Sequence, residues 1–396
     1  MTATELVLDG VLRAHPGDPS RRDAFLPSTT VQVHAANLMT LPDGTLGCVW
    51  FGGTQEGVPD ISIWSSRLDG DRWTPAVPLS DDPTRSEQNP VLFPAPDGRL
   101  WLLWTAQHAG DQDSAEVRCR VSADSGASWG ETRTLFPATG SGGVFVRQPV
   151  VVLPSGRWLL PVFHCVTVPG QKWVGDADTS AVMVSDDAGA TWREVAVPGS
   201  TGCVHMDVVP LPDGTLAAFY RSRWADWVYR STSADDGQTW TAPEPTELPN
   251  NNSSIQVTAL ADGRLAMALN PAQAGPDTPR RLSLYDEIDD TGLAAAQSVP
   301  EPAPADDGRR HAFWGTPRAP MTLALSADGG RSWPHRRDVE VGDGYCLSNN
   351  SRDGVNREFS YPSVHQTADG ALHLAFTHHR KAVQHVVVDP SWVHAG

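Results

Sequence analysis

The chain is poor in lysine and has no long apolar run. Lys172 and Lys381 are its only lysines, so arginine carries nearly all of the positive charge, and the formal net charge is −17. This acidic balance argues against nonspecific nucleic-acid binding, which requires a basic surface. It still allows a local arginine cluster that captures an anion. No apolar stretch approaches the length that spans a membrane, so no membrane partner is expected.

Cysteine is also scarce. The five cysteines are odd in number and irregularly spaced, which argues against a disulfide framework and against a zinc pattern. Cys48 and Cys119 fall in strand-like segments and are expected to be small buried hydrophobic residues. The N-terminal segment MTATELVLDGVLRAH has neither the basic nor the apolar region of a signal peptide, which predicts a cytoplasmic protein.

Helical periodicity is absent as well, whereas turn residues and tryptophan are abundant. The chain contains 35 glycines, 33 prolines and 15 tryptophans. No long stretch repeats its apolar residues at the spacing of a helix. This profile is typical of many short strands joined by tight turns, and it predicts an all-β protein.

One eight-residue pattern, S-x-D-x-G-x-[ST]-W, occurs four times. Its Asp and Ser can bond nearby backbone groups, its Gly permits a positive φ, and its Trp can dock against neighbouring strands. The pattern therefore predicts a stiff turn between two strands. The copies run from Ser122 to Trp129, Ser185 to Trp192, Ser233 to Trp240 and Ser326 to Trp333, and a degenerate copy runs from Ser66 to Trp73.

A second repeat alternates with the first. An Asp-Gly or Ser-Gly pair between two apolar segments is a strong hairpin signal, and it occurs at Asp43, Asp97, Ser155, Asp213, Asp262 and Asp369. Alternation of the two turns gives four antiparallel strands per unit. Six units predict a six-bladed β-propeller of the kind that closes on itself.

The two ends of the chain and the longest interval between Asp-Gly turns, from Asp262 to Asp369, add two expectations to this prediction. The last blade lacks a Trp-ended turn, so we expect the N-terminal segment Glu5–Leu12 to supply its outer strand and close the ring. The whole chain, residues 1–396, is then a single propeller domain. A loop insertion at about residues 271–317 in blade five is expected on the face of the site, either as a lid or as a disordered segment.

Strand order predicts where a site lies. Both kinds of turn emerge on one face, so the loops between strands 2 and 3 and the entries into strand 1 share the other face. This face brings together candidates from all six blades, although any one of them alone could be a solvated or turn-forming residue. The entries carry His34, Asn89, Arg147, His205, Asn250, Asn252, Glu358 and Tyr361, and the loops carry Glu56, Asp60, His164, Asp178, Arg221, Arg223, His378 and Arg380.

The Trp-ended turns resemble the Asp boxes of the sialidase superfamily. From His34 to His385 the chain resembles the sialidase-like branch with BNR repeats, through HAANLMTLPDG, WFGGTQEGVPDISIW, LPNNNSS and FSYPSVHQTADGALHLAF. The resemblance implies a propeller and, in true sialidases, an arginine triad for the substrate carboxylate, an Asp acid/base and a Tyr–Glu pair with Tyr as nucleophile.

Two positions depart from that family pattern. His34 stands at the entry of blade one, where sialidases have an Arg-Ile-Pro motif. Phe359 precedes Ser360, where the sialidase tyrosine is usual. Tyr361 follows two residues later and is expected on the same side of the strand as Phe359.

These departures give a slight preference for β-elimination next to a uronic acid, as in lyases built on similar propellers. Elimination needs a base, an acid and a group that neutralises the carboxylate. His34 or His205 is the candidate base, Tyr220 or Tyr361 the candidate acid, and Arg147, Arg221 and Arg223 the candidate neutralising groups. Substrate contacts are expected from Glu56, Asp60, Asn89, His164, Asn250, Asn252, His378 and Arg380.

Other hypotheses stay open. The leading one is an exo-acting enzyme that cleaves a glycosidic bond beside an anionic sugar in an oligosaccharide or small glycoside. The alternative to elimination is sialidase-like hydrolysis that uses Asp60, Glu358 and Tyr361. A non-catalytic sugar-binding propeller is a second alternative. No cofactor is expected, and a metal held by His34, His164, His205, His378 and His379 has no supporting ligand spacing.

Overall fold

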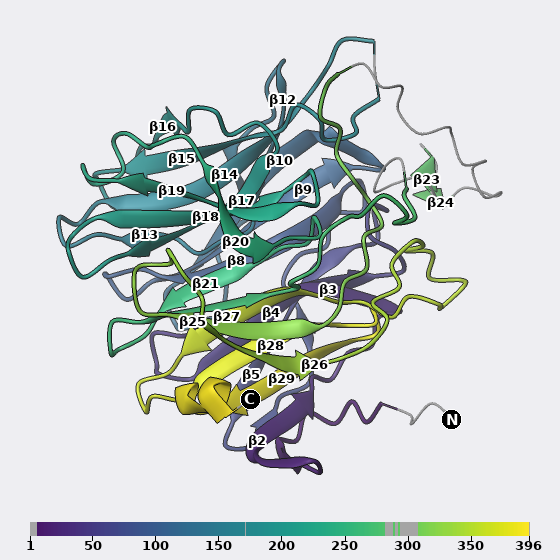
Figure 1. The fold of residues 1–396 in the computed structure, drawn as a ribbon, viewed down its shortest axis with the longest axis vertical. Coiled ribbons are helices and arrows are strands. Elements are labelled where there is room, and N and C mark those ends of the chain that lie inside the picture. The colour runs from purple at the N-terminus through teal and green to yellow at the C-terminus, as the bar shows by residue number, and fades with distance from the viewer. Residues whose placement is uncertain (1–5, 171, 282–287, 290–291, 294–307, 396) are drawn as a thin grey trace.

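Six antiparallel sheets are arranged around one axis, as Figure 1 shows. The structure is a computed structural model that describes residues 6–170, 172–281, 288–289, 292–293 and 308–395. Each of these six sheets has four or five strands, and most strands that are consecutive in the chain are neighbours in the sheet. The prediction of a six-bladed propeller is confirmed.

Blades 1 to 3 use the chain up to residue 196. Blade 1 contains β3 (Gln32–Thr40), β4 (Leu46–Gly53), β5 (Ser62–Asp69), β6 (Arg72–Trp73) and β7 (Val77–Pro78). Blade 2 contains β8 (Ser86–Pro94), β9 (Leu100–His108), β10 (Asp111–Ser122) and β11 (Arg133–Phe136). Blade 3 contains β12 (Gly142–Val146), β13 (Val151–Val152), β14 (Trp158–Val166), β15 (Thr179–Ser185) and β16 (Arg193–Ala196).

Blades 4 to 6 use the remainder of the chain. Blade 4 contains β17 (Cys203–Pro210), β18 (Leu216–Ser222), β19 (Trp227–Ser233) and β20 (Glu244–Pro249). Blade 5 contains β21 (Gln256–Ala259), β22 (Leu265–Leu269), β25 (Met321–Ser326) and β26 (His335–Glu340). Blade 6 contains β27 (Phe359–Gln366), β28 (Leu372–His378), β29 (Ala382–Val388), β2 (Asp18–Phe25) and β1 (Arg13–His15).

A few elements lie outside the blades. β22 pairs directly with β25, although about fifty residues separate them in the chain. The hairpin of β23 (Ile288–Asp289) and β24 (Gly292–Leu293) lies within this segment, much of which is outside the described residues. A 3-10 helix, η1 (Pro390–Ala395), follows β29. In the described part of the chain, no helix has the length and apolar character to cross a membrane.

Both repeated turns form as the sequence predicts. In the Asp-box turn of blade 3, Ser185 Oγ donates to Asp187 Oδ1 at 2.8 Å and accepts from the amide of Gly189 at 2.8 Å. The other Asp187 oxygen accepts from the Thr191 hydroxyl at 2.6 Å. The Asp-Gly turns also agree, since Gly214 has a φ of 84° and Asp213 Oδ1 accepts from the Thr215 amide.

The strand that closes the ring is different from the predicted one. β2 (Asp18–Phe25) pairs with β29, so the two ends of the chain meet in blade 6, where Figure 1 shows purple β2 beside the yellow strands. The segment predicted for this role, Glu5–Leu12, begins outside the described residues. Its later part runs along blade 1, where Val11 pairs with Arg72. The prediction of this segment was wrong because an outer strand needs few apolar residues, and DPSRRDAF carries no clear strand pattern.

Neighbouring blades are linked by one recurrent hydrogen bond near the axis. At five junctions a polar side chain of one blade accepts from the backbone N–H of the innermost strand of the next blade. The pairs are Asn37 with Leu92, Thr105 with Val146, Asp207 with Val257, Gln256 with Val364, and Ser363 with Leu38. These bonds satisfy buried amides that would otherwise be costly, and they fix the blades relative to one another.

Asp207 makes stability depend on pH. Its Oδ2 atom accepts from the Val257 amide at 2.6 Å, and burial raises the pKa of this carboxyl to about 7. An unfolded chain loses that proton near pH 4, whereas the folded chain keeps it to about pH 7. Stability from this group is therefore full below about pH 4 and declines up to about pH 7.

We predict that Asp207→Asn removes this decline, because the amide oxygen still accepts from Val257 and carries no charge. Urea unfolding of wild type and variant between pH 4 and 8 measures it. Asp213→Asn on the surface is the matched control, since hydrogen bonds with Thr215 lower the pKa of Asp213. Identical pH slopes for wild type and Asp207→Asn would contradict the prediction.

Candidate active site

The innermost strands of four blades carry β-bulges at the entry of the channel. The register shifts between His34 and Asn37, Gln88 and Val91, Val204 and Asp207, and Ser360 and Ser363. At each bulge one residue has a positive φ: Ala35 (58°), Asn89 (50°), His205 (54°) and Tyr361 (51°). A bulge redirects the side chains around it, so these strands can aim polar groups at the axis.

Tyr361 is aimed in this way. Its ring centre lies 4.1 Å from that of His34 and 5.6 Å from that of His205, so three blades meet at the phenol. Phe359 instead packs into the apolar cluster between blades 5 and 6 with Leu323. The expectation that Phe359 and Tyr361 share one side of the strand was wrong, because the bulge interrupts the two-residue alternation between them.

Three guanidinium groups surround this phenol. The guanidinium carbons of Arg147, Arg221 and Arg318 lie 5.5, 5.5 and 5.6 Å from the Tyr361 ring centre. Arg221 Nη1 also donates to the phenol oxygen at 2.5 Å. Arg318 was absent from the sequence-based candidates because it stands in the blade-five segment taken as an insertion. It lies three residues before β25, in the loop between strands 2 and 3 of blade 5, and this loop is on the predicted site face, so its position could have identified it.

A fourth arginine, Arg380, is connected to this cluster through the carboxylate of Glu358. Glu358, fully buried, accepts from Arg318 Nη1 at 2.7 Å and from Arg380 Nε. Arg380 Nη1 also donates to Glu56 Oε2 at 2.6 Å. Burial opposes the charge on Glu358, but Arg318 and Arg380 outweigh it and lower its pKa. Glu358 is therefore ionised and holds both guanidinium groups in place.

A second buried ion pair, between Asp178 and Arg223, lies among aromatic rings beside this cluster. Asp178 accepts from Arg223 Nε at 2.9 Å and from Nη2 at 2.7 Å. Trp173 also donates to Asp178 at 2.9 Å. The Arg223 guanidinium lies 5.0 Å from the ring centre of Trp314, which in turn lies 5.6 Å from the guanidinium of Arg221. Asp178 thus neutralises Arg223, whereas Trp314 covers both arginines.

His34 is a neutral hydrogen-bond donor. Burial, followed by the charges of Arg380 and Arg318, lowers its pKa far below the usual value. Its Nδ1 atom lies 2.7 Å from the Thr377 hydroxyl, whose hydrogen has no other acceptor among the described residues. Thr377 therefore donates to Nδ1, and the imidazole carries its hydrogen on Nε2. That Nε2 is buried and has no partner in the described part of the chain.

His205 has the opposite tautomer. Ser254 Oγ lies 3.0 Å from His205 Nδ1, accepts from Arg147 Nε, and donates to the Ile255 carbonyl. Arg221 Nη1 can only donate, so His205 Nε2 accepts from it at 3.3 Å and the hydrogen of the neutral ring is on Nδ1. Burial, together with Arg221 and other arginines, lowers the pKa of His205, so it too is neutral. Its role here is to orient the Arg221 guanidinium.

Other sequence-based candidates lie elsewhere. Tyr220 is packed inside blade 4, where its hydroxyl bonds Ser231 at 2.7 Å, so it does not reach the site. Asp60 is exposed and accepts from the Thr54 amide. His164 pairs with Glu194, His378 with Gln384, and Asn250 with the Ser222 amide, whereas Asn89 occupies the bulge of blade 2. Asn252, in contrast, accepts from Arg221 Nε at 2.8 Å and belongs to the site.

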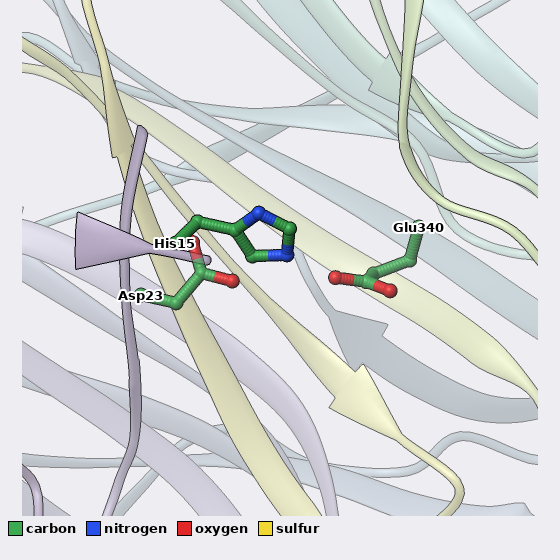
Figure 2. Close-up of side chains that lie close together, drawn as sticks. All are labelled: His15, Asp23 and Glu340. Atoms are coloured by element: carbon green, nitrogen blue, oxygen red, sulfur yellow. The ribbon is translucent and has the colours of Figure 1, made fainter. Parts of the chain in front are cut away.

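The proposed metal ligands do not gather. Of the five histidines considered, His34 and His205 flank Tyr361, whereas the others have the separate partners given above or lie in the β28–β29 turn. Within the described residues, the one group of three that could hold a metal is His15, Asp23 and Glu340, whose side chains point toward one another in Figure 2. Arg21 already donates to Asp23 at 2.6 Å and to Glu340 at 2.5 Å, so these carboxylates have a cation.

Comparison with known proteins agrees with this fold. The family model described as the BNR repeat-like domain matches residues 44–374. The chain belongs to the BNR repeat-like family. No curated protein matches it. The four Asp-box turns of this chain lie on the face opposite the candidate site.

Solved structures show the same architecture at low identity. A Hadza microbial sialidase matches with a TM-score of 0.64 and 14% identity over 92% of this chain, which covers 66% of that protein, just under two thirds of its length. An intramolecular trans-sialidase from Ruminococcus gnavus gives 0.64 and 12% over 91% of this chain and 95% of its own. A protein of unknown function from Dyadobacter fermentans gives 0.63 and 16% over 93% and 99%. At this identity the likeness shows the fold.

The tautomer of His34 is a testable feature of the site. We predict that its ring stays neutral with the hydrogen on Nε2 between pH 5 and pH 8, because burial and the arginines lower its pKa. Nitrogen-15 NMR of imidazole-labelled protein, with the resonance assigned through His34→Gln, measures it. An imidazolium at pH 6, or a hydrogen on Nδ1, would contradict the hydrogen-bond assignment. The depressed pKa also means that this group's contribution to stability is lost as the pH falls below about 6.5.

Proposed function

We propose that this BNR-family protein is an exo-acting glycoside hydrolase of sialidase type, which removes a terminal sugar bearing a carboxylate. The observation that carries the proposal is a set of three buried hydrogen-bond donors in the cluster formed by Tyr361, Glu358 and the side chains bound to them. Arg221 Nη2, Arg380 Nη2 and His34 Nε2 have no acceptor among the described residues. Buried donors without acceptors are costly, so they favour a ligand that supplies oxygen atoms.

The charge balance supports an anionic ligand. Arg223 is neutralised by Asp178, and Arg318 and Arg380 share Glu358 with further help from Glu56. Arg221 has no carboxylate partner in the described part of the chain, because it donates to Asn252, His205 and the Tyr361 hydroxyl, which are uncharged. A fully buried guanidinium without a counter-ion is unfavourable, and a substrate carboxylate would supply one with bidentate geometry.

Two structural relatives carry ligands consistent with this class of substrate. The leech intramolecular trans-sialidase was solved with 2,7-anhydro-Neu5Ac, and matches with a TM-score of 0.65 and 13% identity over 92% of this chain and 69% of its own. The Ruminococcus gnavus enzyme was solved with oseltamivir carboxylate. Both names support a sugar-like ligand with an acid group. The buried position of the arginines here favours a small terminal unit over a polymer chain.

Tyr361 is the proposed nucleophile. Its oxygen attacks the anomeric carbon while the glycosidic C–O bond breaks, and water then releases the sugar from the enzyme. The guanidinium groups around the ring stabilise negative charge on the phenol oxygen and on the substrate carboxylate. The phenol proton passes to the leaving oxygen as the glycosidic bond breaks, so the alcohol leaves neutral, and the attacking water later returns a proton to the phenol. The proposed role of His34 Nε2–H is to donate a hydrogen bond to the leaving oxygen, with its proton retained.

The geometry favours hydrolysis over the β-elimination preferred from the sequence. Elimination would use His34 or His205 as base, but the inferred tautomer of His34 has a hydrogen on Nε2, and Nε2 of His205 accepts from Arg221. The alternative acid, Tyr220, lies inside blade 4. Phe359 stands where the family pattern has a tyrosine. Because the bulge directs Tyr361 toward the axis, Tyr361 can take the role of that tyrosine.

A sugar-binding protein without turnover is the second candidate. It is favoured by one observation: Glu56, Glu358 and Asp178 are all bound to arginine, so their oxygens are poorly placed to protonate a leaving group. This candidate shares the anion site with the hydrolase. The two differ only in whether the bond is cleaved.

We predict that Arg221→Met weakens binding of N-acetylneuraminic acid by about 100-fold, or ~3 kcal/mol, because the carboxylate loses its uncompensated guanidinium. Calorimetry measures the affinity, and release of a fluorogenic sialoside measures turnover. Tyr361→Phe should keep the affinity and abolish the release. Arg157→Met, on the opposite face beside Asp186, is the matched control and should change neither.

The outcomes separate the candidates. Binding that depends on Arg221, with no release from sialosides or uronate glycosides, would replace hydrolysis with the binding role. Unsaturated uronate products would show β-elimination and would contradict hydrolysis. Equal affinities of Arg221→Met and Arg157→Met for N-acetylneuraminic acid would contradict the proposed anion site.

A further inference from the structure

We propose that Arg147 is a positioning residue that holds Tyr361 in its place and makes no contact with substrate. Its significance for catalysis rests on the proposed function. The sequence suggested that Arg147 would neutralise the substrate carboxylate together with Arg221 and Arg223. The contacts of its guanidinium point to a different role.

The side chain of Arg147 crosses the axis of the propeller. It stands between β12 and β13, where the innermost strand of blade 3 is interrupted, and it is 1% exposed. Nη2 donates to the carbonyls of Tyr361 at 3.1 Å and Pro362 at 3.0 Å in blade 6, the blade opposite blade 3 in a ring of six. Nη1 and Nη2 also reach the carbonyl of Ala36 in blade 1, both at 3.2 Å.

Four of the five N–H groups of the guanidinium have acceptors within the protein, and the remaining one is the second hydrogen of Nη1. Nε donates to Ser254 Oγ at 3.3 Å, so all three nitrogens have acceptors within the protein. Arg221 and Arg380 differ, since each keeps an Nη2 without an acceptor in the described part of the chain. A substrate oxygen would therefore be bound by Arg221 and Arg380, whose Nη2 atoms have no acceptor in the described part of the chain, whereas every nitrogen of Arg147 is already held by a protein acceptor.

The carbonyls that Arg147 binds belong to the two bulges that shape the site. Tyr361 has a φ of 51° and Ala35 has a φ of 58°, a region that is unfavourable for residues with a side chain. Such a conformation persists only where its surroundings enforce it. Donation to the carbonyls of Tyr361, Pro362 and Ala36 does so, because it fixes the peptide planes on both sides of the channel.

Tyr361 is the group that would move. Its ring lies 5.5 Å from the Arg147 guanidinium carbon, and its hydroxyl accepts from Arg221. If the bulge relaxed toward regular strand geometry, the alternation would turn the phenol away from the axis. A misplacement of about 1 Å at a reacting group lowers turnover by about 100-fold. Loss of Arg147 should thus reduce the rate and spare the anion affinity.

The test follows Tyr361 directly. The chain has five tyrosines, so protein labelled with 3-fluorotyrosine gives a simple fluorine NMR spectrum in which Tyr361→Phe identifies one resonance. We expect that resonance to shift and broaden in Arg147→Met and Arg147→Lys, and to stay in place in the control Arg157→Met. Arg147→Lys is included because it keeps the buried charge and some donors if the Met variant fails to fold.

Binding and turnover distinguish positioning from substrate contact. Arg147→Lys should bind N-acetylneuraminic acid within about threefold of wild type, whereas kcat on a fluorogenic sialoside falls about 100-fold with little change in KM. The proposal is overturned if the Tyr361 resonance of Arg147→Lys matches wild type, or if its affinity falls as far as that of Arg221→Met. A wild-type protein without turnover would refute the proposed hydrolysis, and the fluorine spectra would still decide the role of Arg147.

Discussion

The guanidinium of Arg147, buried on the axis of the propeller, connects the blades that build the candidate site. A cation in such a place loses its hydration, and only well-aimed acceptors offset that loss. Burial lowers its pKa to about 10, which leaves the group charged at neutral pH. Its acceptors are carbonyls exposed by bulges in two blades, together with a serine in a third. The strained backbone and the buried charge therefore stabilise each other.

The arginines around Arg147 differ in how their charges are compensated. Arg223 is paired with Asp178, Arg318 and Arg380 share Glu358, and Arg221 has uncharged partners only among the described residues. These differences give each guanidinium its own role in the site. Fully paired groups keep the shape of the site, and the incompletely paired ones define where an anion fits. A neutral His34 among them adds a donor without adding to the repulsion between cations.

The turns were readable in the sequence, because their geometry depends on local chemistry. Asp187 with Ser185 and Thr191 forms its hydrogen bonds within seven residues, and Gly214 supplies its positive φ alone. The same logic located the site face, since strand order follows from counting turns. It did not reveal β2, whose polar outer position leaves no periodic signal, or Arg318, which stands at the end of a segment without pattern.

The directions of the side chains at the centre of the candidate site do not follow from local sequence. Tyr361 and Phe359 are two residues apart and should share a side, but a bulge separates them, and that bulge depends on Arg147 in another blade. Tyr220 was a plausible acid by type, yet its strand faces the core of blade 4. The sequence by itself determined the number of blades, the turns and the face on which the candidate residues gather, because those follow from short-range hydrogen bonds and strand alternation. Only the tertiary structure decided which arginines lack a partner, which tautomer each histidine adopts and where Tyr361 points, because those depend on charges and carbonyls brought together from blades far apart in the chain.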